Sequence, residues 1–349
     1  MSFAKRGLRP YSARMPNQEQ NALPDFSHLT PDVVLYLVEE SLGRRCSNLC
    51  RPLTSYINRV YDVEMEDGDW VVVKFYRPNR WSRDALQDEQ DFLFELGERE
   101  IPVIAPMRCA DDKLLQEYHG TYYAIFPKRG GRPLDEPTDR QWLELGRLMA
   151  RVHAVGEMHA PRDRIEIGLE KSTADHVRYI LESNVIPSSV RPRYEESVRG
   201  VLDLVTPLFE GVEKLRIHGD CHRLNIINRP GEPLTLIDFD DMAIGPPVQD
   251  LWMLLPGHVR ESLGELGLIL DGYETFREFD RNALRLIEPL RAMRFLHFTA
   301  WCAHQKADGG FARLAPDWGS EAFWKQEVHD LDQQRQEIVD SLEKPLPPI

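Results

Sequence analysis

Two short segments in the second half of the chain carry side chains that suit phosphoryl transfer. Residues 218–225 contain Asp220 and Asn225, and residues 236–240 contain Asp238. Magnesium-dependent phosphoryl transfer uses one carboxylate to orient the acceptor hydroxyl, and an amide oxygen and a second carboxylate to hold the metal ion. Asp220 fits the first role, and Asn225 and Asp238 fit the second. The two segments therefore predict a phosphotransferase centre.

Short strands are expected to position these three side chains. Asp220 follows the apolar run 215–217, and Asn225 precedes another apolar pair, so the loop between them can turn both side chains toward one cleft. Asp238 ends a predicted strand at 234–237, where its carboxylate can reach a metal ion. Asp and Asn also populate ordinary turns. The occurrence of both segments in this order favours the site over the turns.

The pattern H-G-D-x-H-x-x-N followed by I-D-F-D-D resembles the aminoglycoside phosphotransferase and choline kinase group of protein-kinase-like enzymes. Further blocks resemble one branch of that group, the bacterial stress-response protein kinases, and lie at residues 55–61, 73–81, 130–132, 249–255 and 287–294. The resemblance implies an α+β, two-lobed fold with a small β-rich N-lobe and a larger α-helical C-lobe. It also implies ATP and Mg2+ as cofactors and a serine or threonine acceptor in a protein.

A lysine and a glutamate in the first half of the chain occupy unusual positions for charged residues. Lys74 lies in the second strand of a predicted hairpin, formed by residues 60–65 and 70–76. Glu89 lies near the centre of the apolar face of a predicted helix, residues 82–98. Burial of an unpaired charge is costly, so an ion pair between Lys74 and Glu89 is expected unless Glu89 reaches solvent at the lobe edge. The resemblance implies that this pair holds the ATP phosphates.

No glycine-rich G-x-G-x-x-G segment precedes Lys74, which departs from the usual protein kinase pattern. The resemblance implies that the turn at residues 55–59 covers the nucleotide phosphates instead, with Ser55 as the candidate phosphate contact. The predicted strand 122–126 then runs into a linker at 127–132, where the backbone of a kinase hinge would meet adenine.

The chain divides into a tail and two lobes. Residues 1–26 have no sustained apolar period and are expected to form a mobile tail. Residues 27–127 are the predicted nucleotide-binding lobe, and residues 128–349 are the predicted catalytic and substrate lobe. Besides residues 82–98, the helices are expected at residues 31–40, 142–153, 173–183, 191–210, 262–280, 282–305 and 320–342.

Several charged residues near these motifs have two possible roles each. Asp240 and Asp241 fit either a second magnesium ion or a solvated turn. Asp250 is expected to be a helix N-cap or a loop anchor rather than a catalyst. Arg291 and Arg294 share one face of a helix, and they are expected to pair with acidic residues near Asp241 or Asp250. The alternative is that both arginines line the acceptor pocket and bind a phosphate or carboxylate of the substrate.

Composition excludes several classes of partner. The chain has 43 basic and 57 acidic residues and a net charge of −14, which disfavours nonspecific binding to nucleic acid or anionic membranes. No apolar run is long enough for a membrane span, and no secretory leader is evident. The five scattered cysteines are expected to be free thiols in a reducing compartment, which indicates the cytoplasm. Cys221, beside Asp220, is expected to be an inert filler rather than a redox switch.

The favoured function is a serine/threonine protein kinase of the bacterial stress response, acting on a protein substrate as a monomer. One alternative is a kinase for a small hydroxyl compound of the homoserine, choline or aminoglycoside type. Another is a nucleotide-binding regulator without turnover, but the complete set of predicted catalytic residues argues against it. A hydrolase with a transition metal at His218, Asp220 and His222 would need further ligands, and no other cluster has suitable spacing.

Overall fold

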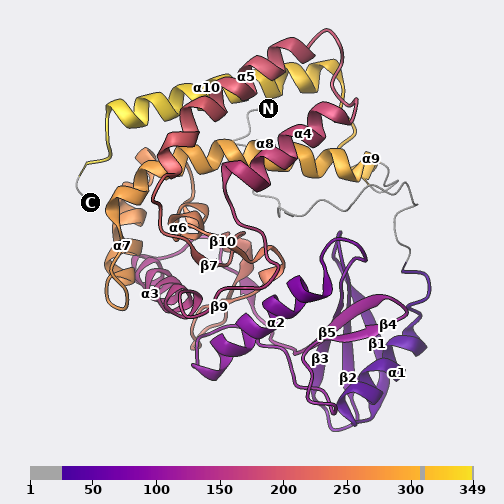
Figure 1. Ribbon diagram of the computed structural model, residues 1–349. Helices are drawn as coiled ribbons and strands as arrows, with labels where there is room; N and C mark the ends of the chain where they lie inside the picture. Colours follow the sequence, from indigo (N-terminus) through magenta and orange to yellow (C-terminus); the bar gives the residue numbers. More distant parts are fainter. Residues whose placement is uncertain (1–25, 307–310, 348–349) are drawn as a thin grey trace.

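The computed structural model describes residues 26–306 and 311–347 (Figure 1). The predicted tail, residues 1–26, lies outside these ranges apart from its last residue. Among the described residues, no helix is both long and apolar enough to cross a membrane.

The N-terminal part is built on a five-stranded antiparallel sheet with strand order β1-β2-β3-β5-β4 (Figure 1). Its strands are β1 (Cys46–Leu53), β2 (Arg59–Met65), β3 (Trp70–Phe75), β4 (Gln116–Tyr118) and β5 (Thr121–Pro127). The predicted hairpin is confirmed as β2 and β3. Lys74 lies in the central strand β3, opposite Val60 of β2 and Ala124 of β5.

Two helices accompany this sheet. Helix α1 (Pro31–Leu42) begins at Thr30, whose hydroxyl accepts a hydrogen bond from the backbone N–H of Val33, and ends at Gly43 in the left-handed region. Helix α2 (Arg83–Glu98) begins at Ser82, which caps the N–H of Ala85. Both helices confirm the predictions from the sequence.

Helix α2 belongs to two apolar cores. Ala85 and Leu86 pack in a cluster with Ala124 of the sheet. Phe92 and Leu96, two turns further on, belong to the large core of the C-terminal part. The predicted boundary at residue 127 remains a prediction, because α2 joins the two parts through its own side chains.

The C-terminal part is mostly helical, and the predicted α+β fold class is confirmed. Its longer helices are α3 (Asp139–Gly156), α4 (Ala174–Glu182), α5 (Arg191–Val205), α6 (Val248–Leu254), α7 (Leu263–Tyr273), α8 (Ile287–Gln305) and α10 (Glu321–Glu343), and α9 is the short helix Phe311–Leu314. Shorter turns of helix lie at Leu169–Thr173, Thr206–Phe209, Arg223–Asn225, Phe239–Asp241, Val259–Glu261 and Arg281–Leu286. Helix α8 packs against both α4 and α10, and α5 lies along α10 (Figure 1).

Short strands in the C-terminal part carry the predicted catalytic segments. Strand β7 (Leu215–Ile217) pairs with β10 (Ala243–Gly245), and β8 (Ile226–Asn228) pairs with both β6 (Arg132–Pro133) and β9 (Thr235–Leu236). All these pairs are antiparallel. The loop that contains Asp220 connects β7 to β8, and Asp238 lies two residues after the end of β9.

Candidate active site

The hairpin of β8 and β9 brings the two predicted metal ligands to one end. Ile226 pairs with Leu236 in the ladder, and the backbone N–H of Ile237 donates a 3.0 Å hydrogen bond to the carbonyl oxygen of Asn225. Asn225 therefore enters the hairpin where Asp238 leaves it. An amide oxygen and a carboxylate are hard oxygen ligands, and this donor set fits Mg2+.

Asp238 adopts a rare backbone conformation. Its φ of +64° and ψ of +65° lie in the left-handed region, which residues other than glycine seldom occupy. The side chain remains 44% exposed, whereas Phe239, Asp240 and Asp241 are buried. The turn thus directs one carboxylate outward from an otherwise buried segment. Such strained backbone is concentrated at functional sites.

Asp250 of α6 anchors the loop that carries Asp220. Its carboxylate accepts hydrogen bonds from the backbone N–H groups of His218 (2.8 Å) and Gly219 (2.9 Å). The imidazole of His153 lies 3.0 Å from the same carboxylate and 3.0 Å from the Tyr273 hydroxyl. A carboxylate only accepts, so His153 donates to Asp250 through Nε2. The prediction of a loop anchor is confirmed; the helix N-cap is Pro247 instead.

His218 joins this loop to the segment that carries Asp238. Its Nε2 donates to the carbonyl oxygen of Ile237 (2.9 Å), and its Nδ1 accepts from the backbone N–H of Asp220 (3.3 Å). Gly219, between them, has φ +84°, and a Cβ there would lie 2.1 Å from the carbonyl oxygen of Asp241. Only glycine therefore fits this position, and the H-G-D sequence holds both catalytic segments in register.

The carboxylate of Asp220 is buried and contacts two cationic or polar side chains. Its Oδ1 lies 2.9 Å from Nη2 of Arg294, and its Oδ2 lies 3.5 Å from Nε2 of His222. The amide of Asn225 donates to the backbone carbonyl of Asp220 at 3.0 Å. The side chain of Asn225 thus contacts the backbone of Asp220, and the convergence of both side chains on one cleft remains a prediction.

Lys74 pairs with carboxylates of the C-terminal part, and the predicted ion pair with Glu89 is wrong. Its ammonium lies 3.1 Å from Oδ1 of Asp238 and forms a short contact with Oδ1 of Asp240. Burial by itself would lower the pKa of Lys74, but the charges of Asp240 and Asp238 outweigh it and hold the pKa well above its usual value. Lys74 therefore lies beside Asp238, the predicted metal ligand.

Glu89 has a different cationic partner. The guanidinium of Arg164 lies 2.7 Å from its Oε2, and the Tyr76 hydroxyl donates to its Oε1 at 3.0 Å. Arg164 also donates to the carbonyl oxygens of Ala85 (2.7 Å) and Asp240 (2.6 Å). Arg164 was not predicted as a functional residue, because it lies in an irregular segment after α3. The only available signal was the need of Glu89 for a cation.

Asp240 and Asp241 are buried in ion pairs, so the prediction of a solvated turn is wrong. Arg80 lies 3.0 Å from Asp240 and 2.8 Å from Asp241, and Asn58 donates to Asp240 at 2.5 Å. Burial opposes ionisation of Asp240, but Lys74 and Arg80 outweigh it and lower its pKa to about 2. Burial raises the pKa of Asp241 well above its usual value, and Arg80 offsets this only in part. A second magnesium ion at these residues remains a prediction.

The turn that contains Ser55 is held in a defined shape beside this network. Arg77 donates to the carbonyl oxygens of Ile57 (2.9 Å) and Tyr56 (3.0 Å), and its own N–H donates to the Asn58 side chain (3.1 Å). Ser55 is half-buried within the turn, between β1 and β2. Its contact with phosphate remains a prediction. Asn58 links this turn directly to Asp240.

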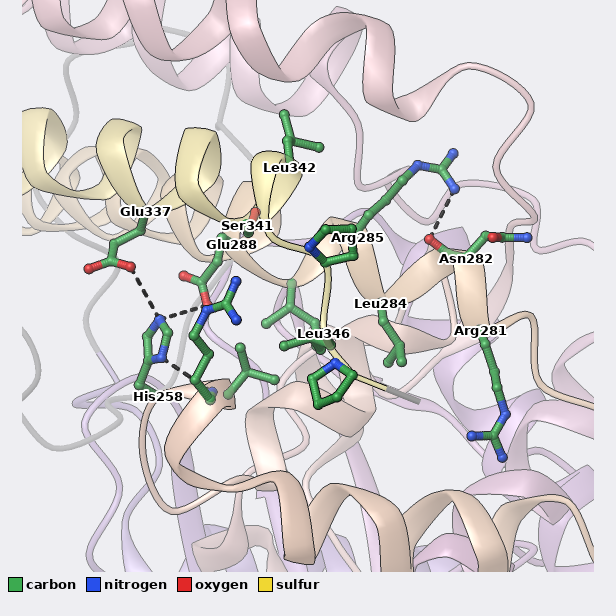
Figure 2. A pocket seen from close by; sticks show the side chains of 15 residues that line it. His258, Arg281, Asn282, Leu284, Arg285, Glu288, Glu337, Ser341, Leu342 and Leu346 are labelled. Carbon is green, nitrogen blue, oxygen red and sulfur yellow. Dashed lines mark hydrogen bonds and ion pairs between the residues drawn. The ribbon is translucent and has the colours of Figure 1, made fainter. Parts of the chain in front are cut away.

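Arg291 and Arg294 both pair with acidic residues, and Asp220, the partner of Arg294, lies in the loop that Asp250 anchors, as predicted. Arg294 contacts Asp220, and Arg291 lies 3.2 Å from Glu288 and over the ring of Trp252. Glu288 lines a separate cavity of about 530 Å3 between the start of α8 and the end of α10, where His258 lies 3.3 Å from it (Figure 2). None of the predicted site residues lines that cavity.

Two further expectations concern cysteine and metal chemistry. Burial raises the pKa of the Cys221 thiol well above its usual value, so the thiol stays protonated and packs beside Met149 as a filler. Within residues 26–306 and 311–347, no group of three or more His, Cys, Asp and Glu side chains is arranged to hold a metal ion.

Comparison with known proteins places these residues in a broader context. Residues 50–287 match the model of a protein family that is described as "Phosphotransferase enzyme family". Stress response kinase A of Escherichia coli (strain K12) is 37% identical over 305 residues, covering 87% of this chain and 92% of that protein. Serine/threonine protein kinase RdoA of Salmonella typhimurium (strain LT2) is 37% identical over 304 residues, with the same coverage of 87% and 92%. The resemblance to the stress-response kinase branch is confirmed.

A solved structure supports the same fold. Amicoumacin kinase in complex with AMP-PNP, Ca2+ and Ami superposes with a TM-score of 0.67 at 19% identity, covering 91% of this chain and 95% of that chain. At this identity the likeness concerns the fold, and the kinase-like architecture predicted from the sequence is confirmed.

Proposed function

The chain belongs to the phosphotransferase enzyme family, and we propose that it transfers the γ-phosphoryl group of ATP, with Mg2+, to serine or threonine hydroxyls of a protein. The relatives that support a protein acceptor share 37% of their residues with this chain over 87% of its length, and one is named a serine/threonine protein kinase. Support for ATP comes from the family and from the AMP-PNP complex of a protein with the same fold.

The observation that carries the proposal is the convergence of Asp220, Asn225 and Asp238. Asn225 contacts the backbone of Asp220, and the hairpin of β8 and β9 places Asp238 beside Asn225. Asp220 is suited to accept the proton of the acceptor hydroxyl as the oxygen attacks phosphorus. Asn225 and Asp238 would hold Mg2+, which neutralises phosphate charge when bound.

Nucleotide binding is assigned to the groups that face Asp238 from the N-terminal part. Lys74 supplies a buried positive charge for the phosphates, and the turn with Ser55 supplies backbone N–H groups. Glu89 does not contact Lys74; it fixes α2 through Arg164, and its role is to position this helix. In this proposal Lys74 binds phosphate, whereas Glu89 has a structural role.

The acceptor class is tested by transfer from γ-labelled ATP with Mg2+. Wild-type protein and Asp220→Ala are each incubated with dephosphorylated casein, with a lysate depleted of ATP, and with homoserine, choline and an aminoglycoside. Phosphoserine or phosphothreonine formed only by the wild type supports the proposal. If the label appears on a small hydroxyl compound and not on protein, the protein acceptor is contradicted, but the assignment as a phosphotransferase still holds.

A further inference from the structure

The two oxygens of the Asp220 carboxylate have different surroundings. Oδ1 forms a 2.9 Å ion pair with Arg294, and these side chains are 3% and 13% exposed. Oδ2 lies 3.5 Å from Nε2 of His222, which is too long for a good hydrogen bond. One oxygen is therefore occupied by a strong donor, and the other is held loosely.

His222 is the loose contact. Its side chain is 4% exposed, and neither ring nitrogen has a hydrogen-bond partner among the residues that the structure describes. Because this imidazole makes no hydrogen bond to Oδ2, it can yield the position beside Oδ2 to a hydroxyl group without breaking a protein hydrogen bond.

Arg294 comes from a rigid element. It lies in the middle of α8, whose neighbouring residues Met293 and Leu296 are buried in the main core. Its Nη1 also lies 3.8 Å from the sulfur of Met253 in α6. The terminal torsion of an aspartate is broad, so a guanidinium on a fixed helix restricts a carboxylate that would otherwise rotate.

We propose that Arg294 is a positioning residue for phosphoryl transfer: it holds Oδ1 of Asp220 so that Oδ2, beside His222, receives the proton of the acceptor hydroxyl. This inference rests on the proposed phosphotransferase function. The hydroxyl oxygen forms a bond to the γ-phosphorus, its proton passes to Oδ2, and the bond from the γ-phosphorus to the bridging oxygen breaks. ADP leaves with that electron pair, and Asp220 later releases its proton to solvent.

The positive charge of Arg294 has a second consequence at this position. Asp220 and Asp241 are close enough for their charges to interact, and the γ-phosphate of ATP is itself anionic. A guanidinium on Asp220 offsets one of these negative charges within a shielded site. The positive charge of Arg294 thereby lowers the repulsion that an anionic phosphoryl group would meet at Asp220.

The test compares Arg294→Gln and Arg294→Lys with Arg291→Gln. Arg291 lies one turn away on α8 and pairs with Glu288 rather than with Asp220. Arg291→Gln therefore also removes an ion pair of α8, but leaves the contacts of Asp220 unchanged. Transfer from γ-labelled ATP to casein, and to water as ATP hydrolysis, is the probe. A misplaced catalytic group costs on the order of 100-fold in rate, so kcat of Arg294→Gln should fall about 10- to 100-fold at an unchanged KM for ATP. Arg294→Lys should be intermediate, and Arg291→Gln should stay near wild type.

Two further measurements separate positioning from loss of structure. Added guanidinium ion at millimolar concentration should raise kcat of Arg294→Ala but not that of Asp220→Asn. In the Asp220→Asn background, Arg294→Gln should cause little additional loss, because Arg294 acts through Asp220. If Arg294→Gln does not fold, wild-type kcat in Arg294→Lys and no guanidinium rescue contradict the inference.

The outcomes distinguish this inference from the proposed function. If the wild type transfers phosphate to neither casein nor water, the phosphotransferase itself is not supported, and Arg294 has no step to serve. If the wild type is active and Arg294→Gln has the same kcat as Arg291→Gln, the proposed phosphotransferase function is supported, but the positioning role of Arg294 is contradicted.

Discussion

Glu89 and Arg164 form a fully buried ion pair of 2.7 Å, with side chains 1% and 0% exposed. Glu89 belongs to α2, and Arg164 comes from the segment after α3 and also holds the carbonyl oxygen of Asp240. This pair fixes α2 to the segment that carries Asp238. The helix is thus positioned by the C-terminal part, and Lys74 remains available to the carboxylates of the site.

Replacement of Arg164 should destabilise the protein strongly. Arg164→Gln leaves Glu89 buried without its ion-pair partner, and removal of one partner of a buried ion pair costs about 3–5 kcal/mol. Urea unfolding followed by circular dichroism measures the change. Arg162→Gln, at an exposed arginine two residues away, is the matched control and should change the free energy of unfolding by less than about 0.5 kcal/mol. Equal stability of the two variants would be evidence against the buried pair.

Gly219 should not tolerate a side chain. Gly219→Ala places a Cβ 2.1 Å from the carbonyl oxygen of Asp241 at φ +84°, so the catalytic loop must shift. Strained backbone of this kind costs on the order of 1–3 kcal/mol, and phosphate transfer should fall by about 100-fold. Gly264→Ala in α7, where a Cβ meets no atom within 4 Å, is the control and should keep full activity. An active Gly219→Ala variant would contradict the proposed register of the two segments.

Acid should destabilise the packing of α4 on α8. Burial lowers the pKa of His176 to about 3, and its ring lies 4.6 Å from that of His297. The unfolded chain takes up a proton below pH about 6.5 while the folded one does not, so stability is complete above this pH and is lost as the pH falls toward 3. The loss from His176 is about 1.4 kcal/mol per pH unit, or about 2 kcal/mol at pH 5. Urea unfolding at pH 7 and pH 5 measures the free energy of unfolding, which should fall less between these pH values in His176→Gln than in the wild type. An identical fall in both proteins would refute the prediction.

Asn225 should govern the magnesium requirement. Asn225→Leu removes the amide oxygen and retains a similar volume, so the magnesium concentration for half-maximal activity should rise by about 10-fold or more. Magnesium-free nucleotide binding, measured by fluorescence of a labelled ATP analogue, should stay near wild type because Lys74 is intact. An unchanged magnesium dependence would exclude Asn225 as a ligand.

Local patterns predicted much of this structure. The apolar patterns at residues 31–40 and 82–98 predicted α1 and α2, and the H-G-D segment and Asp238 located the predicted catalytic segments. These signals depend on neighbours in the chain, through capping, turn geometry and apolar periodicity.

Pairs between distant side chains were not predictable in the same way. A buried carboxylate requires a cation, but the sequence does not say which one, and the choice of Lys74 for Glu89 was wrong because Arg164 is nearer in the fold. The pair of Arg294 with Asp220 spans α8 and the catalytic loop, and no local pattern encodes it. The fold decides such contacts through the packing of whole helices.

The most direct measurement is the rate of γ-phosphoryl transfer from labelled ATP by wild-type protein and by Asp220→Ala, each with Mg2+ and with EDTA. Binding of a fluorescent ATP analogue, measured in parallel, shows that both proteins retain the nucleotide site. The structure predicts magnesium-dependent transfer by the wild type and a rate at least about 100-fold lower for Asp220→Ala at similar nucleotide affinity. Equal rates in the two proteins would contradict the assignment of Asp220 and of the phosphotransferase centre built around it.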